Sequence, residues 1–172
     1  HACMHAQVGA LEEVLAATQG KAVLLIEVKE ASEIYPDIEQ HILDIVKEAE
    51  AVDSVILQSF RDEVLQSFHA LEAPFPLHKL FVFKVWGLPL LYDGHWHMKS
   101  LRAYPYAEAF ASYHKFTGKA LVRHAHRQGK KLNVWTVNQP ARIRRMLKRG
   151  ADGIISDYPG RVREVCQEFR PE

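Results

Sequence analysis

Short apolar runs, separated by longer polar segments, recur along this chain of 172 residues. Runs of this kind that are rich in Val, Ile, Leu and Phe are typical of strands buried inside a sheet. We interpret six of them as strands: residues 23–29, 55–57, 80–83, 101–104, 132–137 and 154–156. Because amphipathic segments lie between most of these runs, the pattern predicts repeated β–α units and a parallel sheet.

Helices are expected where apolar residues recur at spacings of three and four. We predict helices over residues 11–17, 36–50, 59–71, 107–128, 138–150 and 160–169. Ser59 and Asp62 have the spacing of a capping box at a helix start. Asn138 and Pro140 form another start signal, and Gly150 forms the matching stop signal. The spacing of strand, helix and strand in the last third of the chain favours a right-handed parallel connection.

Residues 84–103 form the one long segment without a clear period. Its large aromatic residues, Trp86, Tyr92 and Trp96, argue against disorder. Since long loops in compact domains are usually functional, we interpret the segment as a packed rim that covers part of a binding site.

Composition places the chain among ordinary globular domains, with 48% hydrophobic and 25% charged residues. We expect one domain over residues 1–172. The formal net charge of +1 gives no indication of a nucleic-acid partner. No apolar run is long enough to span a membrane, and no signal peptide is visible, so we expect a cytoplasmic protein. Assembly with further copies of the chain stays open. The first residue is His1, and we expect the natural start to lie upstream.

Residues 119–149 carry ten Lys or Arg residues and no acidic residue. A surface that attracts phosphate groups or membranes is one interpretation. We favour a solvated helix face, because basic residues near a helix C-terminus also suit the helix dipole.

The first strand carries unusual chemistry at its C-terminal end. Leu25, Glu27 and Lys29 share one face, because side chains alternate along a strand. A solvated strand end with a loose ion pair is the plainer interpretation. The functional one is a metal-ligating carboxylate beside a lysine that neutralises a phosphodiester.

Several motifs together resemble the glycerophosphodiester phosphodiesterase family. They are LEEVLA at 11–16, IEVK at 26–29, QSF at 58–60, VWTVN at 134–138 and GADGIISDYP at 150–159. The resemblance implies a (β/α)8 TIM barrel of which this chain holds the strands that correspond to the third through the eighth. The family's H-R-G, Glu-x-Asp and H-D motifs of the first two strands do not occur in these 172 residues, which fall short of the roughly 250 that are typical of the barrel.

The resemblance also implies site residues and a reaction. It assigns Glu27 to the metal, Lys29 to catalysis and to the substrate phosphate, and Trp135 and Phe60 to the mouth of the substrate pocket. It implies hydrolysis of glycerophosphodiesters to an alcohol and glycerol 3-phosphate, in lipid and glycerol metabolism, with Mg²⁺ or Ca²⁺ as cofactor. Asp157 is interpreted as structural, because it lies in a turn.

Two other functions stay open. One is a barrel-type binding module without catalytic histidines. The other is a different phosphodiesterase on the same barrel, related to phosphoinositide phospholipase C. The VWTVN and DGIISDYP motifs favour the glycerophosphodiester phosphodiesterase family over the relatives of phosphoinositide phospholipase C. Whichever holds, six strands without the first two would leave two edge strands unpaired.

Overall fold

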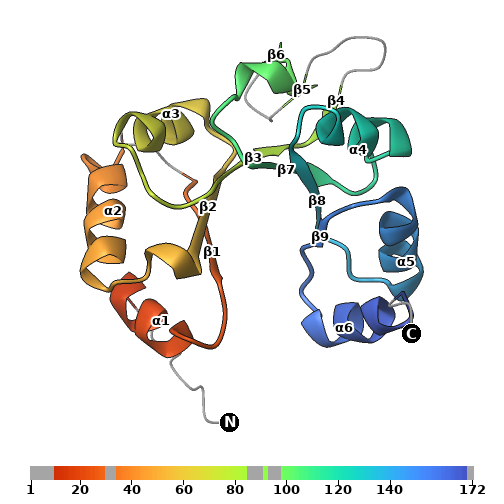
Figure 1. Cartoon of the computed structure of the whole chain (residues 1–172), viewed down its shortest axis with the longest axis horizontal. Helices are drawn as coiled ribbons and strands as arrows, with labels where there is room; N and C mark the ends of the chain where they lie inside the picture. The colour runs from red at the N-terminus through yellow and green to blue at the C-terminus, as the bar shows by residue number, and fades with distance from the viewer. Residues whose placement is uncertain (1–9, 30–33, 85–90, 93–97, 170–172) are drawn as a thin grey trace.

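The computed structural model describes residues 10–29, 34–84, 91–92 and 98–169. Six parallel strands form one sheet in the order β1-β2-β3-β7-β8-β9. The sheet curls into an arc, and the helices lie on its convex side (Figure 1). The predicted α/β architecture with a parallel sheet is therefore confirmed, as an open part of a (β/α)8 barrel.

The order of elements follows the β–α repeat. The strands of the arc are β1 (Leu24–Glu27), β2 (Val55–Ser59), β3 (Leu77–Phe81), β7 (Ala109–Tyr113), β8 (Lys131–Trp135) and β9 (Gly153–Ile154). The helices are α1 (Leu11–Thr18), α2 (Ile38–Glu48), α3 (Asp62–Ala70), α4 (Lys119–His126), α5 (Pro140–Arg149) and α6 (Pro159–Gln167). Two 3₁₀ turns, η1 (Val52–Ser54) and η2 (Leu101–Ala103), precede β2 and β7.

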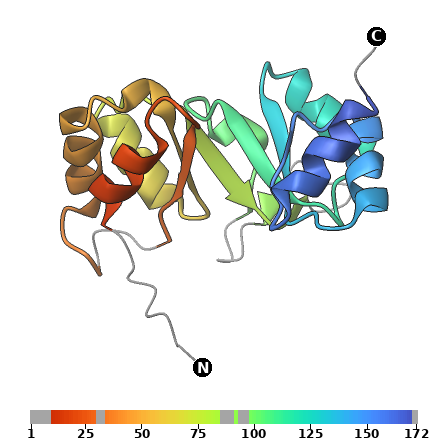
Figure 2. The ribbon, with the colours of Figure 1, turned by 90° about the horizontal axis from the view of Figure 1, so that it is seen from below.

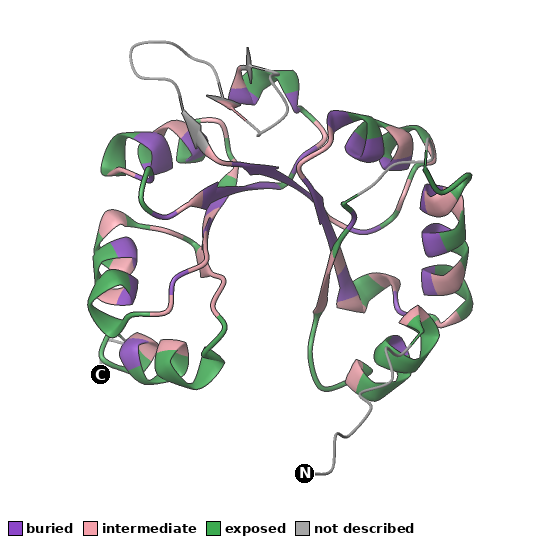
Figure 3. Ribbon diagram, turned by 180° about the vertical axis from the view of Figure 1, so that it is seen from behind, coloured by how far each residue is buried: buried purple, intermediate pink, exposed green. Residues whose placement is uncertain are grey.

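The hydrophobic core lies between the convex face of the sheet and the helices. Buried residues line the strands and the inner faces of the helices, whereas the outer helix faces are exposed (Figure 3). The largest cluster joins β1, β2 and β3 to α1, α2 and α3, and two smaller clusters join β7 and β8 to α4, α5 and α6. Because side chains alternate along a strand, the remaining strand positions project onto the concave face.

The arc does not close. Among the described residues, β1 pairs only with β2, and β9 pairs only with β8. Figure 2 shows the strands running between two groups of helices, α1 to α3 and α4 to α6. The expectation of two unpaired edge strands is thus met within the described parts of the chain.

The predicted strand over 101–104 is wrong, and the helix predicted over 107–128 is confirmed only in its second half, as α4 after Gly118. Residues 101–103 form η2, and the strand is β7, which lies between β3 and β8. Its Ala109, Ala111 and Ser112 side chains have no β-preference of their own. All three are buried in the middle of the sheet, so pairing on both sides decides the local structure.

Most of the aromatic segment 84–103 lies outside the described residues. Its described parts belong to a small antiparallel sheet of β4 (Phe83–Lys84), β5 (Leu91–Tyr92) and β6 (Met98–Lys99). This sheet and η2 occupy the connection between β3 and β7. The predicted rim over the binding site stays a prediction.

The backbone of the last part of the chain requires glycine at two positions. Gly150 ends α5 with a φ of 88°, a left-handed conformation that glycine adopts without strain. At Gly153 on β9, an added Cβ would lie 2.4 Å from Oδ1 of Asn133 on β8. The segment GADG at 150–153 therefore allows both the helix stop and the close approach of two strands.

Candidate active site

The structure places Glu27 and Lys29 at the C-terminal end of β1, on its concave side. Val28 is buried in the helix-side core, and Leu24 and Ile26 pack against that core. The alternating positions Glu27 and Lys29 therefore face the other way, and both are exposed. In (β/α)8 barrels, active sites lie at this end of the strands. The backbone positions of Glu27 and Lys29 agree with the predicted place at the mouth of the barrel, and their roles in a site stay predictions.

The serine of the QSF segment fixes the backbone between these two charged residues. The Ser59 hydroxyl donates a hydrogen bond of 2.6 Å to the carbonyl oxygen of Val28. The same oxygen atom of Ser59 accepts a bond of 3.0 Å from the backbone N–H of Arg61. Ser59 therefore ends β2 and does not cap a helix, so the predicted capping box is wrong. Helix α3 begins three residues later without a side-chain cap.

Three aromatic side chains, from the ends of β7 and β8 and from the residue after β2, gather at the same end of the sheet. The Trp135 ring meets the ring of Phe60 edge-on with 5.6 Å between centroids, and lies 5.2 Å from the ring of Tyr113. We call Phe60, Tyr113 and Trp135 the aromatic rim. The sequence analysis predicted Phe60 and Trp135 at this place. It missed Tyr113, because that residue was assigned to a helix.

The indole of Trp135 has an unused donor. Its Nε1 atom is buried, and no acceptor among the described residues hydrogen-bonds to it. Because a buried N–H group without an acceptor is costly, a ligand or further polypeptide that supplies an acceptor would be stabilised there.

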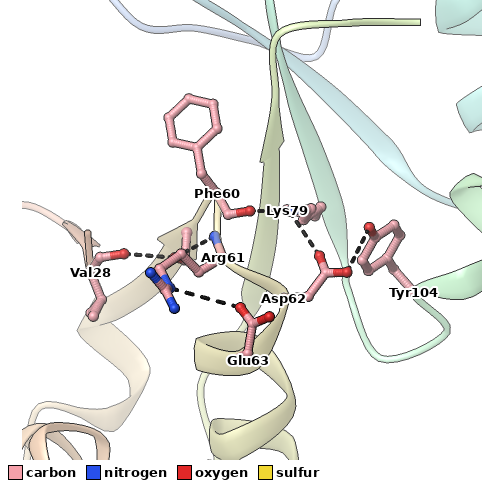
Figure 4. Close-up of polar contacts among 8 residues, drawn as sticks. Val28, Phe60, Arg61, Asp62, Glu63, Lys79 and Tyr104 are labelled. Carbon is pink, nitrogen blue, oxygen red and sulfur yellow. Dashed lines mark hydrogen bonds and ion pairs between the residues drawn. The ribbon is translucent and has the colours of Figure 1, made fainter. Parts of the chain in front are cut away.

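A buried ion pair holds the turn that carries Phe60 (Figure 4). Lys79 of β3 is fully buried, and its Nζ lies 2.9 Å from Oδ1 of Asp62. The same ammonium group donates a hydrogen bond to the carbonyl oxygen of Phe60. Tyr104 donates a bond of 3.2 Å to the other carboxylate oxygen of Asp62. These contacts link β2, α3 and β3 on the convex side, directly behind the aromatic rim.

A histidine lies deeper in the concave face. His78 of β3 is buried, and its Nδ1 is 3.4 Å from Nδ2 of Asn133. Burial lowers the pKa of His78, and the nearby Glu108 opposes that effect in part. His78 lies near the N-terminal end of β3, close to Glu108, which precedes β7. Sequence reasoning did not single it out.

Hydrogen bonds join the VWTVN motif to the DGIISDYP motif. Oδ1 of Asn138 accepts bonds of 3.0 Å from the Ser156 hydroxyl and from the backbone N–H of Asp157. Its amide nitrogen donates a bond of 2.7 Å to the Asp157 carboxylate. This geometry supports a structural role for Asp157, since it ties the chain after β8 to the chain after β9.

The described residues do not by themselves complete a metal centre. Nowhere in this part of the chain do three His, Cys, Asp or Glu side chains come together as a candidate metal site. Glu27 offers one carboxylate, whereas Mg²⁺ and Ca²⁺ require about six or more oxygen ligands, part of which are waters. The arrangement therefore provides a single candidate ligand, a cation at Lys29 and an aromatic rim.

None of the described helices has the length and apolar character needed to cross a membrane.

Comparisons with known proteins agree with the geometry. A model of the glycerophosphoryl diester phosphodiesterase family matches residues 2–161. A glycerophosphodiester phosphodiesterase of Bacillus altitudinis is 28% identical over 164 residues, which are 93% of this chain and 63% of that protein.

Two solved structures have the same fold. A Silicibacter pomeroyi DSS-3 protein, assigned as a glycerophosphoryl diester phosphodiesterase, superimposes with a TM-score of 0.78 and 26% identity over 92% of this chain and 56% of its own. An Oleispira antarctica phosphodiesterase, solved with the product sn-glycerol-3-phosphate, gives a TM-score of 0.69 and 17% identity over 84% of this chain and 55% of its own. The chain thus spans about three fifths of the relatives that it matches. The family match over nearly all of its residues, together with the fold and the motifs, shows that the chain belongs to the glycerophosphoryl diester phosphodiesterase family.

Proposed function

We propose that the protein hydrolyses glycerophosphodiesters to an alcohol and glycerol 3-phosphate. The observation that carries this proposal is the position of Glu27 and Lys29 at the C-terminal end of β1, next to the strand that leads to Phe60 of the aromatic rim, in a chain of this family. The product complex of the Oleispira antarctica phosphodiesterase supports a small phosphorylated glycerol as ligand of this fold.

The residues of this chain supply the electrostatic part of the reaction. In the reaction, water adds to phosphorus, the P–O bond to the alcohol breaks, and a proton reaches the departing alcohol oxygen. Lys29 places a fixed positive charge where negative charge grows on the phosphoryl oxygens. Phe60 and Trp135 offer an apolar surface and one N–H donor to the glycerol or alcohol part. We assign the proton transfers to no residue of this chain.

Glu27 is proposed as one oxygen ligand of a divalent cation. A carboxylate is the kind of ligand that Mg²⁺ and Ca²⁺ prefer. When bound, such an ion would add positive charge at the substrate phosphate. The expected cytoplasmic location, the role in lipid metabolism and the association with further copies stay predictions.

The proposed activity is tested by incubating the intact protein with glycerophosphocholine and measuring the release of glycerol 3-phosphate and choline. Hydrolysis that depends on Mg²⁺ or Ca²⁺ would support the proposal. Calorimetric binding of glycerophosphocholine without any hydrolysis would instead support the binding module. No binding and no hydrolysis with any glycerophosphodiester would contradict both.

Two substitutions at Trp135 should distinguish the contribution of its aromatic ring to substrate binding from that of its N–H group. Trp135→Ala is expected to raise KM for glycerophosphocholine about tenfold, which corresponds to the loss of about 1.4 kcal/mol of contact. Trp135→Phe keeps an aromatic ring beside Phe60 and Tyr113 and removes only the N–H group, so it should raise KM less. An unchanged KM in both variants would exclude Trp135 from the substrate site.

Removing the carboxylate at the strand end should weaken metal binding. Glu27→Gln keeps the size of the side chain and is expected to lower the affinity for Mg²⁺ or Ca²⁺ by more than about tenfold in a calorimetric titration, with a parallel loss of hydrolysis. Glu12→Gln on α1, which changes another exposed carboxylate, is the matched control. Equal metal affinity in the two variants would remove Glu27 from the metal site.

A further inference from the structure

A small cationic cavity lies between the turn after β7 and helix α5. Its volume is about 100 Å³. The residues that line it are His114, Lys115, Arg142, Arg145, Met146 and Arg149. We call it the basic cavity. The ring centroids of His114 and Tyr113 lie 4.9 Å apart, and Nζ of Lys115 lies 5.7 Å from the centre of the Tyr113 ring. The basic cavity therefore borders the aromatic rim at Tyr113, but none of its lining residues belongs to the rim.

Positive charge in the basic cavity is not neutralised. In the described parts of the chain, Lys115, Arg142, Arg145 and Arg149 form no ion pair with a carboxylate. The same helix offers a contrast, because Arg144 forms a two-pronged pair with Glu168 at 2.6 and 2.7 Å. A merely solvated helix face gives no reason for this difference between the two sides of α5.

The cavity also has a built interior. Met146 is buried and lines the cavity together with the cationic side chains, and His114 is only 7% exposed. No side chain among the described residues hydrogen-bonds to the imidazole of His114. Arg149 donates to the carbonyl oxygen of Thr117, which holds its guanidinium beside the cavity. A buried polar ring and an anchored guanidinium therefore line the same small space.

The positive charges in the basic cavity repel one another. Burial, together with the charges of Arg142 and Lys115, lowers the pKa of His114. Burial and the charge of Arg145 lower the pKa of Arg149. A bound anion would reverse this mutual repulsion, because an opposite charge within a few ångströms favours the charged form of each group.

We propose that the basic cavity binds one phosphate group, as inorganic phosphate or as a phosphomonoester, with residues other than Glu27, Lys29 and the aromatic rim. Arginine guanidinium groups match phosphate oxygens with paired hydrogen bonds, and several cations suit a doubly charged anion. A space equal to about three water molecules, at roughly 30 Å³ each, is large enough for a phosphate group.

The test is a calorimetric titration of the intact protein with inorganic phosphate at constant ionic strength. It uses Lys29→Met as background, because this change removes the phosphate contact proposed for the mouth. Adding Arg142→Gln and Arg145→Gln should weaken phosphate binding by at least about tenfold, since hydrogen bonds between charged groups are strong. Both arginines are exposed, so the variant should fold.

A charge-matched control isolates the cavity. Arg123→Gln and Lys148→Gln remove the same two charges from exposed positions on α4 and α5. This variant should bind phosphate within about twofold of the background protein. Equal weakening in the two double variants, or no binding of phosphate in the background protein, would overturn the proposal.

The source of the phosphate group is distinguished with vesicles. Phosphatidylcholine vesicles with and without phosphatidic acid are sedimented with the protein. Binding that requires both phosphatidic acid and the two arginines would identify a lipid phosphomonoester. Binding of free phosphate alone would identify a soluble ligand. Both results support a phosphate site, and vesicle binding that does not depend on Arg142 and Arg145 would count against it.

Discussion

Replacing Lys29 by methionine in the intact protein is expected to lower kcat for glycerophosphodiester hydrolysis by about 10²- to 10³-fold, the usual effect of removing one preorganised electrostatic contact. Lys29 is exposed at the end of β1 and faces the concave side, where it can reach a phosphate group. Methionine keeps most of the length of the unbranched side chain and removes the charged ammonium group. The measurement is the release of glycerol 3-phosphate at saturating substrate, together with the affinity for that product.

A control at the other end of the same strand separates this effect from bulk charge. Lys21→Met removes an exposed lysine that precedes β1. It lies at the N-terminal end of the strand, so kcat should change little. Lys29→Arg restores the charge and should recover part of the rate. If Lys29→Met and Lys21→Met had equal rates, the lysine would have no role at the phosphate.

Asp62→Ala is expected to reduce the free energy of unfolding by about 3–5 kcal/mol, because it leaves the ammonium group of Lys79 buried without its carboxylate. Lys79 is fully buried, and its Nζ lies 2.9 Å from Asp62. Denaturant unfolding of the intact protein measures the effect. Since Lys79 also holds the carbonyl oxygen of Phe60, the fluorescence of Trp135 should change as the aromatic rim shifts.

A double variant and a control at a surface ion pair test whether the buried ion pair causes this loss of stability. Asp62→Ala combined with Lys79→Met removes both charges and should recover most of the lost stability, since an apolar pair can replace a buried ion pair. Glu108→Ala breaks the pair between Glu108 and Lys131, whose side chains are largely exposed at 46% and 63%. Its effect should be much smaller and should vanish in salt. Equal losses for Asp62→Ala and Glu108→Ala would contradict the buried-pair argument.

Much of the fold was predictable because local signals and tertiary environment agree. In the stretch from 129 to 159, an apolar run, a helix with proline near its start and glycine at its end, and a second apolar run specify β8, α5 and β9 in order. The candidate site followed for a similar reason. Alternation along β1 places Glu27 and Lys29 on one face, and a buried strand has only two faces.

The errors arose where pairing overrides local preference. Ala109, Ala111 and Ser112 carry little β-preference, and the signal for β7 lies in its two neighbours in the sheet. Tyr113 was missed in the same way, because its place in the aromatic rim depends on that strand. Ser59 and Asp62 have the spacing of a capping box, but the Ser59 hydroxyl bonds to Val28 and Arg61, and the Asp62 carboxylate pairs with Lys79.

By itself, the sequence determined the parallel α/β class, five of the six strand locations, the exposed pair at the end of β1 and the family. These rest on periodicity and on short motifs, which act within a few residues of one another. Only the tertiary structure decided that Lys79 is buried against Asp62 and Phe60, that Tyr113 joins the rim, and that five basic side chains surround one cavity. Each of these unites residues far apart in the chain, and such contacts depend on how the strands align and the helices pack.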